Sequence, residues 1–286
     1  MKKKTIAEFV TKHGGDRIRE LEKQLAAEHS KVDALSDARS RIRVETSKDC
    51  QFSFAAIGDT HVGSLYFNQP AFLAFYEYAT KARGVKRFYH TGDVLAGHRM
   101  FRGQEFETRD LGLDAQVKRF ALVVPVPKGK AVTDEVCFIV GNHDLSFKSL
   151  AGVSVGQTLQ DAAPGWKYLG AEQARVEWKT PNGPFTLAIQ HPGGGTAYAI
   201  SYSPQKIVDS LEGGTKPDML LLGHYHKAEF LPSYRNVAVC QTGTFERQSP
   251  FMARRGLAAH VGGWIFDVTV GKGHHVIRGE FVAFYV

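Results

Sequence analysis

Five short apolar runs in this sequence each end in a segment that carries aspartate, asparagine or histidine. The runs span residues 52–57, 85–89, 136–140, 185–189 and 219–222, and the polar segments follow at 58–61, 92–93, 141–144, 191 and 223–226. Runs of this length, bounded by glycine and polar residues, predict buried strands. Because sites in α/β sheets form beyond the carboxyl ends of strands, we expect the five segments to meet in one place.

Helical patterns separate several of these predicted strands. Asn68 can cap a helix that has Pro70 in its first turn, and Gly84 can end it. Further helices are expected near residues 113–121 and 203–211, whereas the sequence from residue 236 onward has mainly strand character. The alternation predicts one α/β domain over residues 50–286.

The first 49 residues differ from the rest. They are rich in Lys, Arg, Glu and Ala, and their apolar residues have a helical spacing that Gly14 and Gly15 interrupt. We interpret residues 1–49 as a short helical appendage, either a helical hairpin or a helix-turn-helix-like unit. Packing or oligomerisation and DNA contact are both open, and the mixed charge of the segment argues against DNA contact.

The polar segments have the residue types and spacing of metal ligands. Asp59 and His61 are two residues apart, as are His224 and His226. In an extended chain, residues with this spacing face the same way, so each pair can point at one centre. Any one of these segments alone is more often structural than functional. Their combination, each at the end of a predicted strand, predicts a metal site.

The complete candidate ligand set comprises Asp59, His61, Asp93, Asn142, His191, His224 and His226. This mixture of carboxylate, amide and imidazole groups suits manganese, iron or zinc, and magnesium is a further possibility. The set exceeds the needs of one such ion and suits two divalent ions, about 3.5–4 Å apart, that share a bridging carboxylate. Two such ions lower the pKa of a bridging water, so hydroxide is available to attack a phosphate ester near neutral pH.

The same series of segments resembles the calcineurin-like metallophosphoesterases. The resemblance rests on Asp59-x-His61, Gly92-Asp93, Gly141-Asn142-His143-Asp144, His191 and Gly223-His224-x-His226, and it extends over about residues 51–270. It implies a two-sheet α/β sandwich with flanking helices, metal-dependent hydrolysis of phosphate esters, and manganese as a frequent activating ion.

The resemblance also implies a role for each matching residue. The first metal ion would be bound by Asp59, His61 and His226, and the second by Asn142, His191 and His224, with Asp93 between them. His143 would not be a ligand. It would hydrogen-bond the substrate phosphate and protonate the leaving oxygen, and Asp144 would fix its orientation.

Residues near Asp93 resemble two narrower groups. The stretch 92–97, followed by 102–105, is similar to the small exonuclease subunit of archaeal D-family DNA polymerase and to phage-associated metallophosphoesterases. The net charge of +7 and the pI near 9.2 also favour polyanionic partners. The substrate-binding candidates are His98, Arg102, Arg254 and Arg255, for which a solvated surface role is the alternative.

These observations favour a phosphodiesterase or nuclease that acts on DNA or RNA. A phosphatase or phosphodiesterase for a small molecule or phosphoprotein is the alternative, because one metal site serves both kinds of ester. A non-catalytic scaffold is less favoured, since no expected ligand is missing.

The sequence has no apolar stretch long enough to span a bilayer, no signal-peptide core and no disulfide pattern among its three cysteines. We therefore expect a cytoplasmic protein without membrane contact, and the sequence does not indicate its oligomeric state.

Overall fold

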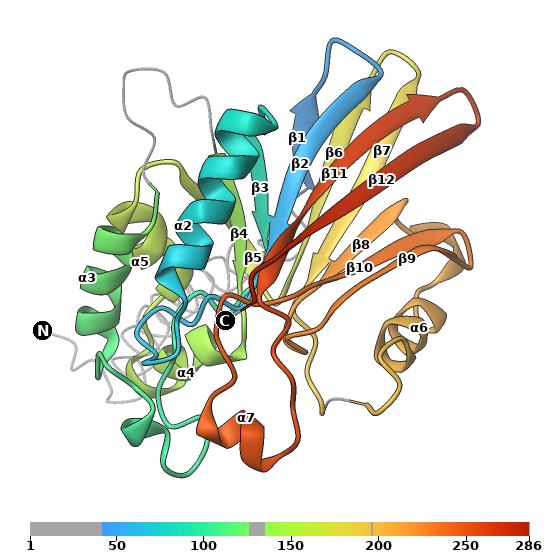
Figure 1. Cartoon of the computed structure of the whole chain (residues 1–286). Helices are drawn as coiled ribbons and strands as arrows, with labels where there is room; N and C mark the ends of the chain where they lie inside the picture. Colours follow the sequence, from blue (N-terminus) through green and yellow to red (C-terminus); the bar gives the residue numbers. More distant parts are fainter. Residues whose placement is uncertain (1–41, 126–134, 196, 286) are drawn as a thin grey trace, which may run out of the picture. The chain divides into compact units, whose positions relative to one another are not determined.

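The computed structural model describes residues 42–125, 135–195 and 197–285 (Figure 1). The strands in these residues form two mixed sheets of six strands each, with helices on the outer faces. The predicted two-sheet α/β sandwich is therefore confirmed. Among the described helices, none combines the length and the apolar character that crossing a bilayer would require.

The first sheet has the strand order β12-β11-β2-β3-β4-β5. Its strands are β2 (Gln51–Ile57), β3 (Arg87–His90), β4 (Glu135–Val140), β5 (Trp166–Ala171), β11 (Gly262–Gly271) and β12 (His274–Ala283). Strands β2 to β5 run parallel to one another, whereas β11 is antiparallel to both β2 and β12. The carboxyl ends of β2, β3 and β4 therefore lie at one edge of this sheet.

The second sheet has the order β1-β6-β7-β8-β10-β9. Its strands are β1 (Ile42–Thr46), β6 (Gln173–Thr180), β7 (Gly183–Gln190), β8 (Met219–Leu222), β9 (Ala228–Tyr234) and β10 (Val237–Thr242). Strands β7, β8 and β10 are parallel neighbours. The predicted helical appendage was wrong for residues 42–46, which pair with β6 as a strand, and residues 1–41 lie outside the described part.

Alternation of side chains along the strands places apolar groups on both faces of the sheets. In β2, Phe52 and Phe54 face the second sheet, and the ring of Phe52 stacks on that of Trp178 at 4.1 Å. Ala55 and Ile57 point the other way, into the core beneath the helices. Because β2 is buried on both faces, its sequence is a continuous apolar run and not an alternating one.

Helices cover the outer faces of both sheets (Figure 1). The helices are α2 (Gln69–Glu77), α3 (Leu113–Val123), α4 (Asn142–Ala151), α5 (Val155–Ala162), α6 (Tyr202–Asp209) and α7 (Pro250–Arg254). A π-helical turn (Tyr78–Ala82) extends α2, and short 3-10 turns span Gln104–Phe106 and Gly213–Thr215. Phe72, Phe120 and Leu159 attach α2, α3 and α5 to the first sheet, and Val208 attaches α6 to the second.

Several predicted elements are present at nearly the expected residues. The side chain of Asn68 caps α2 by accepting a hydrogen bond from the Ala71 amide at 3.3 Å. Helices α4, α5 and α7 and strands β1, β5, β6 and β9 were not predicted. Helix α4 begins with Asn142, His143 and Asp144, so its ligand-type residues stand in its first turn. From the sequence alone, this polar stretch has the character of a loop.

Candidate metal centre

The predicted ligands all follow strands whose carboxyl ends meet. Asp59 and His61 follow β2, Asp93 follows β3, and Asn142 begins α4 directly after β4. His191 follows β7, and His224 and His226 follow β8. The first four residues come from one sheet and the last three from the other. The site therefore lies where the strand ends of the two sheets come together.

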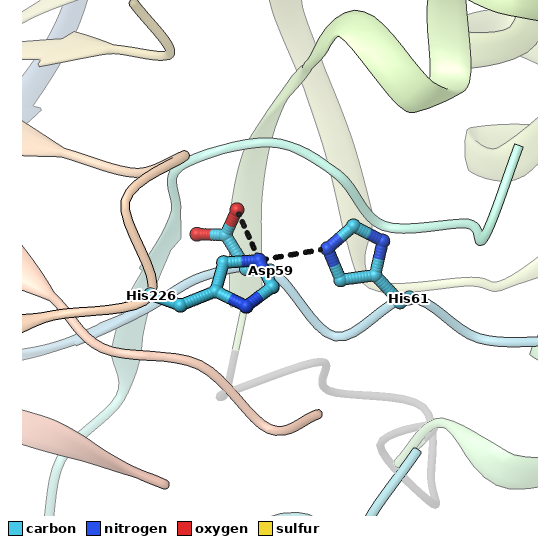
Figure 2. A group of neighbouring side chains, drawn as sticks. All are labelled: Asp59, His61 and His226. Atoms are coloured by element: carbon cyan, nitrogen blue, oxygen red, sulfur yellow. Dashed lines mark hydrogen bonds and ion pairs between the residues drawn. The ribbon is translucent and has the colours of Figure 1, made fainter. Parts of the chain in front are cut away.

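One half of the cluster contains Asp59, His61 and His226 (Figure 2). The Nε2 atoms of His61 and His226 lie 3.0 Å apart, and Nε2 of His226 is 3.6 Å from Oδ1 of Asp59. One potential ligand atom from each residue lies within 4.8 Å of the other two. These are the same three residues that the family resemblance implies for the first metal ion.

The other half contains Asp93, Asn142, His191 and His224. Nε2 of His191 lies 3.2 Å from Oδ2 of Asp93 and 3.0 Å from Oδ1 of Asn142. The same Asn142 oxygen is 3.1 Å from Nδ1 of His224. Ligand atoms of Asp93, His191 and His224 also lie within 4.8 Å of one another.

Asp93 connects the two halves. Its Oδ2 atom is 3.9 Å from Nε2 of His61 as well as 3.2 Å from Nε2 of His191. This central place is the one expected of a carboxylate shared by two cations. The ligand roles themselves, including the bridge, stay predictions.

The backbone around the cluster is held in an uncommon conformation. Asp59, His61, Asp93, His224 and His226 all have positive φ angles, between 44° and 77°. Non-glycine residues rarely adopt this left-handed region, and such residues gather at functional sites, where the surrounding structure compensates for the strain. The turns after β2, β3 and β8 are thus shaped to direct ligand-type side chains, at a cost in local backbone energy.

Glycine is required where the segments touch. A Cβ atom on Gly141 would lie 2.3 Å from Oδ1 of Asp93 and 2.7 Å from Nε2 of His191. A Cβ atom on Gly92 would lie 2.7 Å from Nδ1 of His191, and φ of Gly92 is +100°. Larger residues at either position would displace the ligand-type groups.

Hydrogen bonds from the backbone orient these side chains. Nδ1 of His191 lies 2.8 Å from the Thr91 carbonyl oxygen, which leaves Nε2 turned towards Asp93 and Asn142. The His224 amide donates to the Asp59 carboxylate at 3.0 Å. Such contacts fix the orientation of metal-binding groups in proteins.

The protonation states suit a cation. Burial lowers the pKa of His226 to about 3 and holds the pKa of His61 well below its usual range, so both rings are neutral and carry a free lone pair. Burial raises the pKa of Asp93, but the neighbouring histidines, His191 first among them, together outweigh it and hold that pKa well below its usual range. Nδ1 of His226 is buried without a hydrogen-bond partner among the described residues. The neutral rings of His61 and His226 beside an ionised carboxylate fit a divalent ion. Burial lowers the pKa of His191, but its contacts, that with Asp93 first among them, outweigh burial and raise that pKa to about 10, so this ring would release a proton on binding a cation.

His143 and Asp144 differ in detail from the expected arrangement. Nδ1 of His143 lies 2.7 Å from the Ala96 carbonyl oxygen, and Nε2 is 3.9 Å from Oδ2 of Asp93. The Asp144 carboxylate accepts hydrogen bonds from the amides of Val94, Leu95 and Gly141 at 2.8–3.1 Å. The expected influence of Asp144 on the His143 ring therefore runs through the backbone segment that carries Ala96, and not through a direct hydrogen bond.

Two hollows adjoin the cluster. The first has a volume of about 580 Å³, and its lining includes His61, Asp93, Asn142, His143, His224 and His226, which we call its metal side. Its lining also includes Met100, Phe101, Phe251, Met252, Arg255 and Leu257, which together we call the distal wall. The second hollow, about 480 Å³, shares Met100 and Asn142 with the first and is also lined by His98 and Arg99.

The four candidate substrate-binding residues lie at different distances from the cluster. Arg255 belongs to the distal wall, with its guanidinium 5.0 Å from the centre of the Phe251 ring. His98 lines the second hollow. Arg254 is exposed and lies 3.7 Å from the Glu107 carboxylate. Arg102 is exposed and lines neither hollow within the described residues.

Sequence reasoning missed two glutamates in the first hollow. Oε2 of Glu246 lies 3.9 Å from Nε2 of His61, and Glu107 accepts a hydrogen bond from the Phe251 amide at 3.0 Å. Glu246 follows the end of β10, which is the parallel neighbour of β8. The strand-end rule that identified the metal ligands would have found Glu246 if residues 237–242 had been treated as a separate strand.

Comparison with known proteins identifies the fold. The sequence pattern of the calcineurin-like phosphoesterases matches residues 52–228. The Plasmodium protein GAP50, described as the anchor in the inner membrane complex, is similar in structure, with a TM-score of 0.50 and 13% identity over 82% of this chain and 85% of that one.

Two further solved structures show weaker similarity. One is a predicted phosphoesterase from Streptococcus pneumoniae, with a TM-score of 0.37 and 11% identity over 81% of this chain and 98% of that one. The other is Vps29 from Entamoeba histolytica in complex with zinc, with a TM-score of 0.37 and 15% identity over 82% and 100%. No curated protein sequence matches the chain significantly.

Proposed function

We propose a nuclease function for this chain, which belongs to the calcineurin-like phosphoesterase family and is therefore a metal-dependent phosphoesterase. In this proposal the substrate is a phosphodiester of DNA or RNA, and two divalent ions, most often manganese, occupy the cluster around Asp93. The ions would supply positive charge for the phosphate and activate a water for attack on phosphorus.

The observation that carries the proposal is the pair of hollows that meet at Asn142 and Met100. A diester has a substituent on each side of its phosphate, whereas a monoester has only one. With the phosphate at the ligand cluster, one hollow can receive each substituent. His98 and Arg99 in the second hollow could bind the next phosphate along the chain, and the net charge of +7 is compatible with a polyanion.

Residues of the chain itself would carry the remaining steps. The Asp59 and Asp93 carboxylates and the imidazoles of the cluster hold the cations. His143 stands at the edge of the first hollow, where its Nε2 would donate to the phosphate and then protonate the leaving oxygen. The Ala96 carbonyl near Nδ1 fixes the ring so that Nε2 points towards Asp93.

The alternative is a phosphodiesterase or phosphatase for a small molecule. The first hollow favours it, because its volume of about 580 Å³ falls within the range of small-ligand sites and its distal wall is largely apolar. In either case, assignment to the cytoplasm stays a prediction.

A substrate panel separates these functions. The manganese-loaded protein should cleave single- or double-stranded DNA or RNA, and chelation should abolish the cleavage. If it hydrolyses p-nitrophenyl phosphate but cleaves no nucleic acid, the nuclease proposal fails and the small-molecule alternative stands. Metal analysis of the active protein, with two ions per chain expected, tests the dinuclear site separately.

A further inference from the structure

We propose that Glu246 accepts a hydrogen bond from the 2′-hydroxyl of the ribose next to the scissile phosphate and so selects ribonucleotides. The inference rests on the nucleic-acid function proposed above and narrows it to RNA. Glu246 belongs to neither half of the ligand cluster described above, although it shares the first hollow with both.

The carboxylate of Glu246 is held firmly in place. Its Oε1 accepts a hydrogen bond from the Ser64 hydroxyl at 2.5 Å, and its amide donates to Oγ1 of Thr244 at 2.9 Å. The Thr244 hydroxyl in turn donates to the Asp59 carbonyl oxygen at 2.7 Å. The position of Glu246 is thereby tied to the turn that carries Asp59 and His61.

The second carboxylate oxygen is available to a ligand. Oε2 of Glu246 lies 3.9 Å from Nε2 of His61 and makes no hydrogen bond with any other described residue. The side chain is 12% exposed and lines the first hollow. A carboxylate fixed through one oxygen, with the other turned to a cavity, is a preorganised hydrogen-bond acceptor.

The location of this acceptor selects the kind of group it can bind. Burial raises the pKa of Glu246 to about 8, whereas divalent ions at the adjoining ligand cluster would favour its ionised form. An ionised carboxylate repels a phosphate oxygen, so its partner in the substrate is a hydroxyl or amino group near the phosphate. In RNA, the 2′-hydroxyl is on the carbon next to the one that carries the 3′ ester oxygen. It is the donor that stands closest to a phosphate held at the cluster, and DNA lacks it.

The rest of the first hollow can receive the nucleoside. The rings of Phe101 and Phe251 stack on each other at 4.0 Å within the distal wall, and Arg255 lies over the Phe251 ring. Aromatic rings and guanidinium groups are common partners of unpaired bases. With the ribose beside Glu246, the base extends towards this wall.

The test uses DNA 12-mers that contain one altered sugar and the manganese-loaded full-length protein. The sugar carries a 2′-hydroxyl, a 2′-fluoro group or hydrogen, and kcat and KM are measured for cleavage on its 3′ side. The 2′-fluoro sugar keeps the ribose-like pucker but cannot donate a hydrogen bond. Each ratio between substrates is taken within one protein preparation, so a variant that folds partially still gives a valid ratio.

The wild-type protein should prefer the 2′-hydroxyl over the 2′-fluoro substrate by about tenfold or more, as expected for a hydrogen bond to a charged group. In Glu246→Met, which keeps the length of the side chain but removes the oxygen acceptor, the preference should fall close to one, with the metal content of the wild type. The control Glu105→Met alters an exposed glutamate outside the hollow and should keep the full preference.

Four results would overturn the proposal. Equal cleavage of the two substrates by the wild type would exclude recognition of the hydroxyl. Loss of metal ions from Glu246→Met would assign the residue to the metal ions instead of to the sugar. A 2′,3′-cyclic phosphate product would show that the hydroxyl acts as nucleophile. Cleavage of none of the oligonucleotides, alongside turnover of p-nitrophenyl phosphate, would remove the nucleic-acid function itself.

Discussion

The two sides of the first hollow are built in different ways. On the metal side, Asp59, Asp93 and His191 are at most 2% exposed, and each is fixed by its place directly after a buried strand. The distal wall comes from the loop after Ala96 and from the short helix α7, which appears below the strand ends in Figure 1. Its Phe101 and Phe251 are half-buried, and Arg255 is exposed.

This difference in construction indicates that the metal side carries the chemistry and that the distal wall recognises the substrate. Residues fixed by two sheets cannot move without disturbing the core, which suits groups that must hold cations in a set geometry. Loop residues can change without loss of the fold, which suits groups that recognise a particular substrate. Variants on the metal side should therefore affect metal binding and turnover, whereas variants of the distal wall should affect substrate binding.

Asp93→Ala should have the largest effect. Asp93 lies between the two halves of the cluster, so its loss weakens metal binding in both. Metal ions contribute several kcal/mol of transition-state stabilisation, which predicts a loss of kcat/KM of about 10³-fold or more. Metal analysis and kinetics, with chelated wild type as reference, check this result. Retention of both ions by the variant would refute a central role for Asp93.

His143→Ala should have the next largest effect, and it should not change metal content. His143 lies against Asp93 and the ring of His61, and it is expected to act as the general acid, which typically contributes about 10²–10⁴-fold. The rate with an ester of a very acidic alcohol should fall less, because such a leaving group needs no proton. A fall in bound metal would instead identify His143 as a ligand.

Phe101→Ala should act on substrate binding. Stacking of a base on an aromatic side chain is worth about 1–3 kcal/mol, so KM for an oligonucleotide should rise about tenfold while kcat changes little. An oligonucleotide without a base next to the scissile phosphate should show no such change. Phe106→Ala removes a ring that is 80% exposed and outside the hollow, and serves as the control. A large fall in kcat for Phe101→Ala would contradict the division between the two sides.

The metal side could be located from the sequence, because strand ends and short spacings determine where its residues lie. Asp59-x-His61 and His224-x-His226 are local patterns, and their convergence follows from the parallel order of the strands. The distal wall could not be predicted in this way. Phe101 and Phe251 are 150 positions apart in a 286-residue chain and meet only through loop packing, with no periodic pattern to indicate it.

The elements of the fold likewise divide into those that the sequence predicts and those that it does not. The strands β2, β3, β4, β7 and β8 were predicted because they are continuous apolar runs that end in glycine or polar residues. Strand β6 was missed because its one outward face alternates Gln173, Arg175 and Glu177 with buried residues, which weakens the apolar run. Helix α7 has only five residues and depends on the Ser249 cap and on Glu107 for its first turn. Tertiary contacts, more than local propensity, place such a short helix.

Arg102→Ala should have the smallest effect and the clearest dependence on substrate length. Arg102 is exposed and outside both hollows, so it can reach only the backbone of a long nucleic acid. We expect kcat/KM for a dinucleotide to stay unchanged. For a long strand, the plot of log affinity against log salt concentration should become shallower, and the magnitude of its slope should fall by about 0.7–0.9. Arg255→Ala, which alters the distal wall, should affect both substrates. An equal salt dependence of wild type and Arg102→Ala on a long strand would mean that bound nucleic acid does not cross the surface beside Arg102.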